Sequence, residues 1–294
     1  MATPRVWLIT GASSGFGLEM TRLVLERGDI AVATLRKPEV LSDLVAQYPK
    51  DKLLVLKVDV SKHGDIINAF AKTREVFGRL DVVFNNAGYA VMGEVEGTPD
   101  DVARAMFEVN FWGAAHVSQE AVKFFREVNK PGVGGRLIQI SSGTGVTGWP
   151  STGFYSATKH ALEGLSETLY KELDPAWNIK LTIVVLGAFK TNVIKTGMVV
   201  LPPHPAYSNP ALQSVIMRSA ILASVHTDND PRWAVPGDTK KAVKVLYRLS
   251  ELTDPPLRLP LGKDSVTICR DKIASFTADV DQYEPWSEGI TRSS

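Results

Sequence analysis

Tyr155 and Lys159 stand four residues apart at the start of a helix-like segment, a spacing that places both side chains on one helix face. Ser142 lies thirteen residues before the tyrosine, at the end of a strand-like run, where its hydroxyl would point into a crevice. Moving hydride to or from a carbonyl carbon requires moving a proton to or from its oxygen. These three residue types therefore suit redox chemistry at a carbonyl or an alcohol.

The lysine has a definable role beside the tyrosine. A free tyrosine has a pKa of about 10, so equal amounts of phenol and phenolate near pH 7 need a fall of about 3 units, or about 4 kcal/mol. One ammonium about 4 Å away supplies about that much at an effective dielectric near 20. Lys159 would therefore suffice without a metal, and Ser142 would hold the carbonyl oxygen. The pair alone is a weak signal in a chain with seven tyrosines.

A glycine-rich segment at residues 10–17 follows the apolar run at residues 6–9 and precedes an amphipathic stretch. This order predicts a strand, a turn and a helix, and backbone N–H groups at such a helix start suit a phosphate. Gly11 would turn at positive φ, Gly15 would let a pyrophosphate approach, and Gly17 would let the helix pack closely on the strand. An ordinary glycine-rich turn is the alternative.

The residue after the second strand of such a unit lies about 20 positions past the loop and meets the adenosine ribose. An acid there favours NAD, whereas an arginine accommodates the 2′-phosphate of NADP. Here Leu35 occupies the place of the acid, and Arg36 offers a guanidinium fork to a phosphate. The sequence therefore favours NADP. A solvated surface charge is the alternative for Arg36, and Lys37 is expected to be exposed.

Three more sites carry polar or small residues that a crevice could use. Asp59 follows the third strand, where it could accept from an adenine amino group or, with equal weight, cap the next helix. Asn86, Ala87 and Gly88 follow the fourth strand and fit a crevice wall, although an Asn-rich turn is plausible there. Asn110 lies inside a long helical region and predicts a local kink or a water-binding site, because a buried Asn must find partners.

Apolar runs alternate with helix-length segments from residue 5 to about 190. This alternation predicts an α/β fold with a doubly wound parallel sheet in three layers, a Rossmann fold whose crevice lies at the strand C-terminal ends. We expect one domain over residues 1–294. The expected strands are residues 6–9, 30–35, 53–58, 82–85, 137–140 and 181–185, and the expected helices are residues 15–26, 38–47, 63–77, 99–128 and 155–173.

The pattern changes after about residue 190. Residues 195–230 are first rich in proline and then apolar, and they predict a substrate-binding lid with one helix over the crevice. A helix over residues 239–252 and a last strand at about 266–268 are expected next. Residues 280–294 are expected to form a polar tail.

Composition narrows the function classes. The 294 residues carry a net charge of +1 with Lys and Arg spread throughout, which argues against a nucleic-acid footprint or a polybasic membrane patch. Cys269 is the only cysteine, which rules out an internal disulfide and a cysteine-based metal site, and no metal is expected. No apolar run reaches the ~18 residues of a membrane span, and the early glycine loop leaves no room for a signal peptide. We expect a cytoplasmic protein.

Together these motifs resemble the short-chain dehydrogenase/reductase family, over about residues 5–195. The motifs that carry the resemblance are Thr10-Gly-x-x-x-Gly15-x-Gly17, Asn-Asn-Ala-Gly at residues 85–88, Asn110, Ser142 and Tyr155-x-x-x-Lys159. The resemblance implies a catalytic tetrad of Asn110, Ser142, Tyr155 and Lys159. In that tetrad the tyrosine is the acid/base, the lysine binds the nicotinamide ribose and lowers the tyrosine pKa, and the asparagine helps hold a water of a proton relay.

The resemblance also implies a cofactor site, and its Leu35-Arg36 pair is similar to NADP-preferring members that act on steroids and retinoids. One departure is Leu186-Gly187, where the family usually has Pro-Gly; the loss of the proline loosens the backbone there but removes no chemical group. The residues implied to bind NADP(H) are Gly11, Ser13, Ser14, Gly15, Phe16, Gly17, Arg36, Asp59, Val60, Asn86, Ala87, Gly88, Tyr155, Lys159, Gly187 and Thr191.

The predicted function is an NADP(H)-dependent oxidoreductase that interconverts an alcohol and a ketone or aldehyde. The apolar lid, with Val91, Met92, Trp149 and Phe154 near the expected crevice mouth, suggests a lipophilic or aromatic substrate. The alternative, with equal weight, is that much of that set belongs to the core. The alternatives are a cofactor-retaining epimerase or dehydratase and a non-catalytic nucleotide-sensing interaction protein. By analogy with the family, a homodimer or homotetramer is possible.

Overall fold

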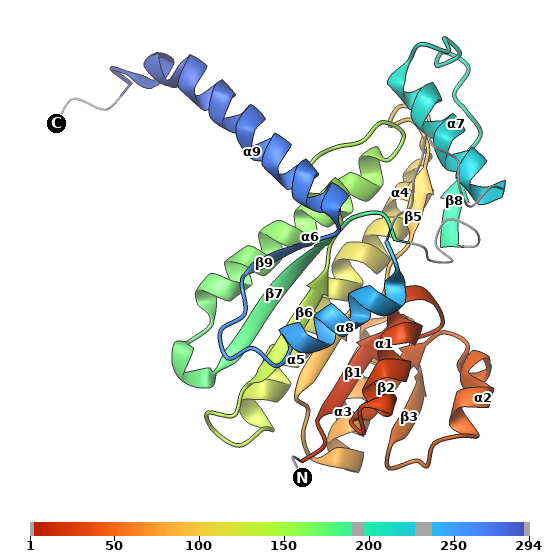
Figure 1. Cartoon of the computed structure of the whole chain (residues 1–294), viewed down its shortest axis with the longest axis vertical. Helices are drawn as coiled ribbons and strands as arrows, with labels where there is room; N and C mark the ends of the chain where they lie inside the picture. The colour runs from red at the N-terminus through yellow and green to blue at the C-terminus, as the bar shows by residue number, and fades with distance from the viewer. Residues whose placement is uncertain (1–2, 190–196, 227–236, 291–294) are drawn as a thin grey trace.

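The computed structural model describes residues 3–189, 197–226 and 237–290, and it is built on a twisted sheet of seven parallel strands (Figure 1). The strands lie in the order β3-β2-β1-β4-β6-β7-β9. The predicted α/β fold with a doubly wound parallel sheet is confirmed. The strand bounds are β1 Val6–Thr10, β2 Ile30–Leu35, β3 Leu53–Lys57, β4 Val82–Asn85, β6 Gly135–Ile140, β7 Ile179–Leu186 and β9 Arg258–Leu261.

Helices cover both faces of this sheet and make the outer layers. Helices α1 (Gly15–Glu26) and α8 (Thr239–Leu249) pack on one face, whereas α3 (His63–Phe77), α5 (Ala114–Glu127) and α6 (Gly153–Glu172) pack on the other. The remaining helical segments are η1 Pro38–Leu41, α2 Ser42–Val45, α4 Asp100–Phe107, η2 Glu108–Gly113, η3 Gly143–Gly145, η4 Pro175–Trp177, α7 Gln213–His226, α9 Lys263–Tyr283 and η6 Glu284–Ser287.

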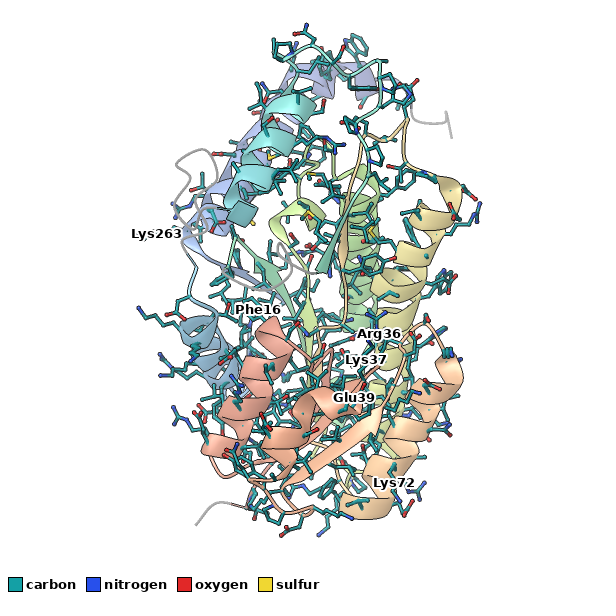
Figure 2. The ribbon with its side chains drawn as sticks, turned by 90° about the vertical axis from the view of Figure 1, so that its right-hand side faces the viewer. Phe16, Arg36, Lys37, Glu39, Lys72 and Lys263 are labelled. Carbon is teal, nitrogen blue, oxygen red and sulfur yellow. The ribbon has the colours of Figure 1, made fainter. Side chains whose placement is uncertain are left out.

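The strand order reverses between β1 and β4, which pair with each other. Connections from β1 run toward β2, and those from β4 run toward β6, so the loops at their C-terminal ends diverge and leave a crevice. Figure 2 shows Phe16, at the start of α1, and Arg36, just after β2, at this edge of the sheet, where both line the same cavity. The fold thus brings the glycine-rich loop to the place where a ligand is expected.

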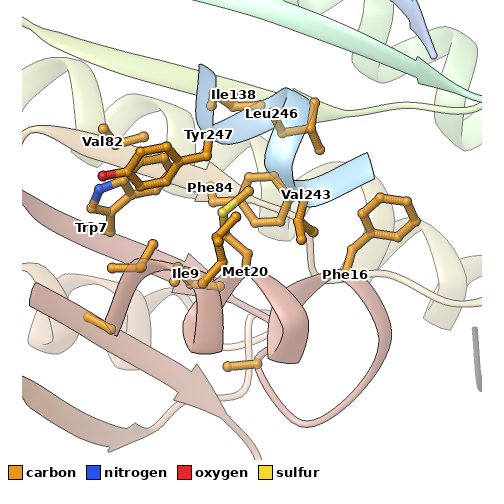
Figure 3. Packing of buried hydrophobic residues seen from close by; sticks show 14 of the residues in the cluster. Trp7, Ile9, Phe16, Met20, Val82, Phe84, Ile138, Val243, Leu246 and Tyr247 are labelled. Atoms are coloured by element: carbon orange, nitrogen blue, oxygen red, sulfur yellow. The ribbon is translucent and has the colours of Figure 1, made fainter. Parts of the chain in front are cut away.

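The core follows the alternation of side chains along each strand. In β1, Trp7 and Ile9 join the cluster beneath α1 and α8, while Val6 and Leu8 join the cluster beneath α3 and α5. Figure 3 shows the first cluster, in which the rings of Trp7 and Tyr247 stack with centroids 5.3 Å apart. Because helices cover both faces, the strands are apolar at successive positions.

The predicted strand at residues 266–268 is wrong, because these residues lie in α9. The last strand is β9, which includes Pro260. A proline fits there because β9 lies at the edge of the sheet, where β7 is its one partner among the described strands. Helix α9 then runs through the start of the region expected as a polar tail.

Two further differences lie near the crevice. The expected helix at residues 99–128 is divided into α4, the π-helical turn η2 and α5. A second parallel sheet has two strands, β5 (Ala90–Met92) and β8 (Met198–Val200). The sequence analysis did not predict this sheet. Strand β8 leads toward α7, within the expected lid (Figure 1). In the described ranges, no helix combines the length and apolar character needed to cross a membrane.

Candidate active site

A cavity of about 360 Å³ lies at the C-terminal ends of the central strands. It collects most of the residues that the sequence singled out, from loops that are far apart along the chain. Gly17 and Asn110 lie behind its wall, and Thr191 lies outside the described residues. The predicted residues that line it are Gly11, Ser13, Ser14, Gly15, Phe16, Arg36, Asp59, Val60, Asn86, Ala87, Gly88, Ser142, Tyr155, Lys159 and Gly187.

The loop after β1 is too tight for side chains at its turn. Gly11 has a φ of +68°, as predicted. A Cβ on Gly17 would lie 2.2 Å from the Gly11 carbonyl oxygen, so α1 can begin this close to the turn only with glycine there. The close contact that Gly17 permits is therefore with the turn itself. Thr10 joins this loop to the next wall, since its hydroxyl accepts from the N–H groups of Asn86 (2.8 Å) and Ala87 (2.9 Å).

The start of α1 fits a pyrophosphate. Ser14 occupies the N-cap position without a side-chain hydrogen bond to the helix, and the first turn holds no acidic residue. Ser13, Ser14, Gly15 and Phe16 all line the cavity. A phosphate there would meet backbone N–H donors and the positive end of the helix dipole without a competing carboxylate. The residues present thus fit the diphosphate of a dinucleotide.

Arg36 and Lys37 follow β2 and are both exposed, but only Arg36 lines the cavity (Figure 2). Leu35 precedes them, is 3% exposed and belongs to the core beneath α1, with part of its surface on the cavity. The cavity wall therefore carries a cation, and no acid, at the position that follows the second strand. That arrangement fits a phosphate on the adenosine ribose.

Asp59 lines the cavity beyond Arg36, and its interpretation as a helix cap is wrong. Lys62 occupies the N-cap position of α3. The Asp59 carboxylate instead accepts from the backbone N–H (3.1 Å) and the hydroxyl (2.7 Å) of Ser61. Partial burial acts to raise the pKa of Asp59, but these hydrogen bonds and the charge of Arg36 outweigh it and hold that pKa below its ordinary value. The carboxylate is thus ionised at neutral pH.

Ser142, Tyr155 and Lys159 meet in the cavity although they belong to two separate elements. Ser142 follows β6 and caps η3, where its oxygen accepts from the Thr144 N–H at 3.2 Å. Tyr155 and Lys159 stand one turn apart in α6. The Ser142 hydroxyl is also hydrogen-bonded to the Tyr155 phenol. The Lys159 Nζ lies 5.9 Å from the centroid of the Tyr155 ring.

The electrostatics of this trio differ from the sequence-based expectation. Burial raises the pKa of Tyr155, and the hydrogen bond with Ser142 opposes that rise. Burial lowers the pKa of Lys159 to about 8, while the charge of Glu163 acts in the opposite direction. The Lys159 Nζ donates to the Ile140 carbonyl at 2.9 Å. A lowered Tyr155 pKa is therefore not a property of the chain alone, because burial of the phenol dominates.

Glu163, one turn after Lys159 in α6, is a buried carboxylate that the sequence analysis did not single out. Its Oε1 accepts from the Ser141 hydroxyl at 2.6 Å, and its Oε2 lies 3.3 Å from the Arg258 Nε. A Cβ on Gly145 would lie within 3.1 Å of the Ser141 Oγ, the Glu163 Oε1 and the Lys159 Cβ. The spacing of four from Lys159 was a visible signal, but the contacts with Ser141 and Arg258 depend on the fold.

Asn110 lies in the π-helical turn η2 and is 0% exposed, so the predicted local kink is confirmed. Its Oδ1 accepts from the Tyr89 N–H at 3.0 Å, and its Nδ2 donates to the Tyr89 carbonyl at 2.8 Å and to the Thr158 hydroxyl at 3.2 Å. Gly88 stands between this amide and Lys159, since a Cβ there would lie 3.1 Å from the Asn110 Oδ1 and 3.7 Å from the Lys159 Nζ. The amide thus supports the cavity wall, and its water-relay role stays a prediction.

Apolar side chains also line the cavity, and only some of them were expected. Trp149 lines it as predicted, and so do Met198 and Ile221 of the lid region. Val91 and Met92 belong to the core instead, and Phe154 does not line the cavity. The lining residues that the sequence analysis missed include Phe189, whose ring meets that of Phe16 edge-on at 5.2 Å, and Ile268 of α9.

The sequence of this chain matches a known protein family and is similar to known oxidoreductases. The family model described as short chain dehydrogenase matches residues 5–197. An uncharacterized oxidoreductase of Schizosaccharomyces pombe is 36% identical over 285 residues, which cover 97% of this chain and 91% of that protein. A 3-ketodihydrosphingosine reductase of Bacteroides thetaiotaomicron is 36% identical over 188 residues, which cover 64% of this chain and 65% of that protein.

A solved structure has a similar fold over nearly the full length of this chain. The crystal structure of a short-chain dehydrogenase from Streptomyces avermitilis has a TM-score of 0.87 and 34% sequence identity with this chain. The match covers 99% of this chain and 100% of that one.

Proposed function

Since the chain belongs to the short-chain dehydrogenase family of oxidoreductases, we propose that it interconverts an alcohol and a ketone or aldehyde with NADP(H) as its cofactor. The observation that carries the proposal is the set of residues that line the cavity. Ser142, Tyr155 and Lys159 lie together in that cavity, and the glycine-rich loop and Arg36 line it as well. The cavity therefore combines a proton donor with donors for phosphate groups.

The protein's own residues would handle the proton and the substrate oxygen. The nicotinamide, when bound, supplies or accepts the hydride. In reduction, the Ser142 hydroxyl donates a hydrogen bond to the carbonyl oxygen, and the Tyr155 phenol transfers its proton to that oxygen. The Lys159 ammonium, protonated below pH about 8, stabilises the phenolate that is left. In oxidation, the alcohol proton returns to the Tyr155 oxygen.

We expect Arg36→Ala to weaken the use of NADPH and to spare that of NADH, because only NADPH carries the 2′-phosphate. Hydrogen bonds to charged groups contribute about 1.5–3 kcal/mol, so the KM for NADPH should rise about tenfold to a hundredfold. Steady-state kinetics with both cofactors measure this. Lys37→Ala is the matched control, since Lys37 is an exposed cation next in sequence that does not line the cavity. Equal changes for both cofactors would contradict the NADP preference.

The substrate is proposed to be lipophilic or aromatic. Part of the cavity lining is apolar and consists of Trp149, Met198, Phe189 and Ile268. An apolar substrate that buries its surface against these side chains would bind more tightly. The name of the Bacteroides relative, a reductase of 3-ketodihydrosphingosine, supports a lipophilic ketone. A panel of ketones and aldehydes of increasing apolar size tests this by the loss of NADPH absorbance. A panel in which small polar carbonyl compounds have the highest kcat/KM would reject the apolar assignment.

We expect Glu163→Gln to move the alkaline limb of carbonyl reduction to lower pH. The Glu163 charge raises the pKa of Lys159 against the effect of burial, so removing it lowers the pH at which the ammonium loses its proton. The expected displacement is about one pH unit, or about 1.4 kcal/mol. The pH profile of kcat measures it. Glutamine keeps the size of the side chain and an oxygen that can accept from the Ser141 hydroxyl.

Glu167→Gln is the control for this prediction, because Glu167 also pairs with Arg258 but lies one turn further from Lys159 along α6. Its pH profile should match that of the unmodified protein. If both variants show the same displacement, the effect belongs to Arg258 and not to the charge beside Lys159.

A further inference from the structure

Helix α9 leaves the body of the protein and stands in solvent over most of its length (Figure 1). Its base is anchored, since the Ser265 hydroxyl donates to the Val185 carbonyl at 2.6 Å and Asp264 accepts from the Ala188 N–H at 2.5 Å. Every residue from 270 to 290 is exposed. An isolated helix of about this length is only marginally stable in water, so a segment that packs on none of the other described residues would gain stability from a partner.

The exposed segment carries a row of large apolar side chains. Ile273, Phe276, Val280 and Tyr283 are 66%, 64%, 49% and 46% exposed. Their spacing of three, four and three residues is that of a coiled-coil seam, which places all four on one side of the helix. Single exposed apolar residues are ordinary, but a contiguous row of them marks an interaction surface. We call these four residues the α9 seam.

The charges along α9 differ between its two halves. Before Phe276 the exposed charged residues of α9 are three cations and one anion, and after it those of α9 and the start of η6 are three anions: Lys263, Arg270, Lys272 and Asp271, then Asp279, Asp281 and Glu284. Two copies of α9 aligned antiparallel would place the basic half of each against the acidic half of the other. A parallel alignment would place like charges together. The charges beside the seam are therefore complementary between two copies of α9 only when the two helices are antiparallel.

We propose that the α9 seam binds the α9 seam of a second copy of this chain, in an antiparallel two-fold dimer. Such a contact is isologous, because each copy offers the same surface. A helix of 21 residues spans about 30 Å, which separates the two bodies at opposite ends of the pair. The seam is small beside an interface of standard size, so the dimer should depend on concentration. The proposal does not depend on the proposed function.

Sedimentation of the full chain over a range of micromolar concentrations tests the dimer. We expect a monomer–dimer equilibrium that weakens as salt is added, because opposite charges flank the seam. The double substitution Ile273→Glu with Phe276→Glu should raise the dissociation constant at least about a hundredfold, or about 2.7 kcal/mol. The control is Ser275→Glu with Ala278→Glu, which adds the same charge on the other side of α9 and should leave the dimer intact.

Oxidative cross-linking tests the direction. In a Cys269→Ser background, chains with Ile273→Cys and chains with Tyr283→Cys should form disulfides with each other when mixed, because an antiparallel pair aligns the base of one seam with the tip of the other. Cross-links confined to like chains would overturn the antiparallel arrangement. A chain that stays monomeric throughout, or a dimer that survives both glutamates, would overturn the seam as the contact. A cooperative thermal unfolding transition shows that each variant is folded.

Discussion

Tyr155→Phe should lower turnover by about 10³-fold and leave the affinity for NADPH nearly unchanged. The substitution removes the hydroxyl that is hydrogen-bonded to Ser142 and keeps the ring beside Lys159. The proton donor is then missing, whereas the glycine-rich loop and Arg36 are intact. Steady-state kinetics on the carbonyl panel measure turnover, and quenching of protein fluorescence by NADPH measures binding.

Tyr170→Phe is the matched control for this experiment. Tyr170 lies on the same helix as Tyr155, is 43% exposed and does not line the cavity. Its loss of a hydroxyl should change neither turnover nor binding. Full activity in the Tyr155→Phe protein would falsify the proposed proton transfer, and loss of NADPH binding in it would assign the tyrosine to cofactor binding instead.

Gly17→Ala should weaken NADPH binding by about a hundredfold, or about 2.7 kcal/mol, and lower the melting temperature. An added Cβ would lie 2.2 Å from the Gly11 carbonyl oxygen and 2.9 Å from the Asn86 Nδ2. Neither of these two atoms can easily move away. The Gly11 oxygen belongs to the backbone, and the Asn86 amide is held by the hydrogen bond that it donates to the Thr10 carbonyl at 2.9 Å. The turn must therefore move, and it carries the N–H groups proposed to hold the phosphates. Fluorescence titration and thermal unfolding measure the two effects.

Gly164→Ala separates this clash from a general effect of adding a methyl group to a helix. Gly164 lies in α6, and an added Cβ there meets nothing within 4 Å. Because alanine has the higher helix propensity, this variant should be as stable as the unmodified protein or more so. Unchanged NADPH affinity in Gly17→Ala would show that the loop adapts and that its close packing is not required.

Much of the fold was predictable because its signals are local. Most strands of the main sheet are covered on both faces and are rich in apolar residues, and six of the seven were expected close to their observed bounds. The seventh, β9, was missed because its Pro260 argues against a strand and its sheet partner β7 is distant in sequence. The assignment of residues 266–268 as a strand failed because a short apolar run fits a strand and a helix equally well.

The candidate site was predictable to the extent that its residues sit at strand ends. A parallel sheet brings those ends to one edge, so Gly11, Arg36, Asp59 and Gly88 could be expected to share a crevice, and they line the same cavity. Glu163 and Ile268 do not follow a strand, since they lie within helices α6 and α9. Their places depend on how α6 and α9 pack, and the partners of Glu163 are separated from it by many residues.

By itself, the sequence determined which residue types stand at each strand end and which lie one helical turn apart. Those relations follow from the fixed periods of strands and helices, and they sufficed for the glycine-rich loop and for the pair Tyr155 and Lys159. Only the tertiary structure decided whether the pKa of Tyr155 is raised or lowered, because the burial of the phenol depends on every element packed around it. The same holds for the α9 seam, which the sequence analysis did not predict, because the exposure of its apolar side chains depends on how the fold places α9.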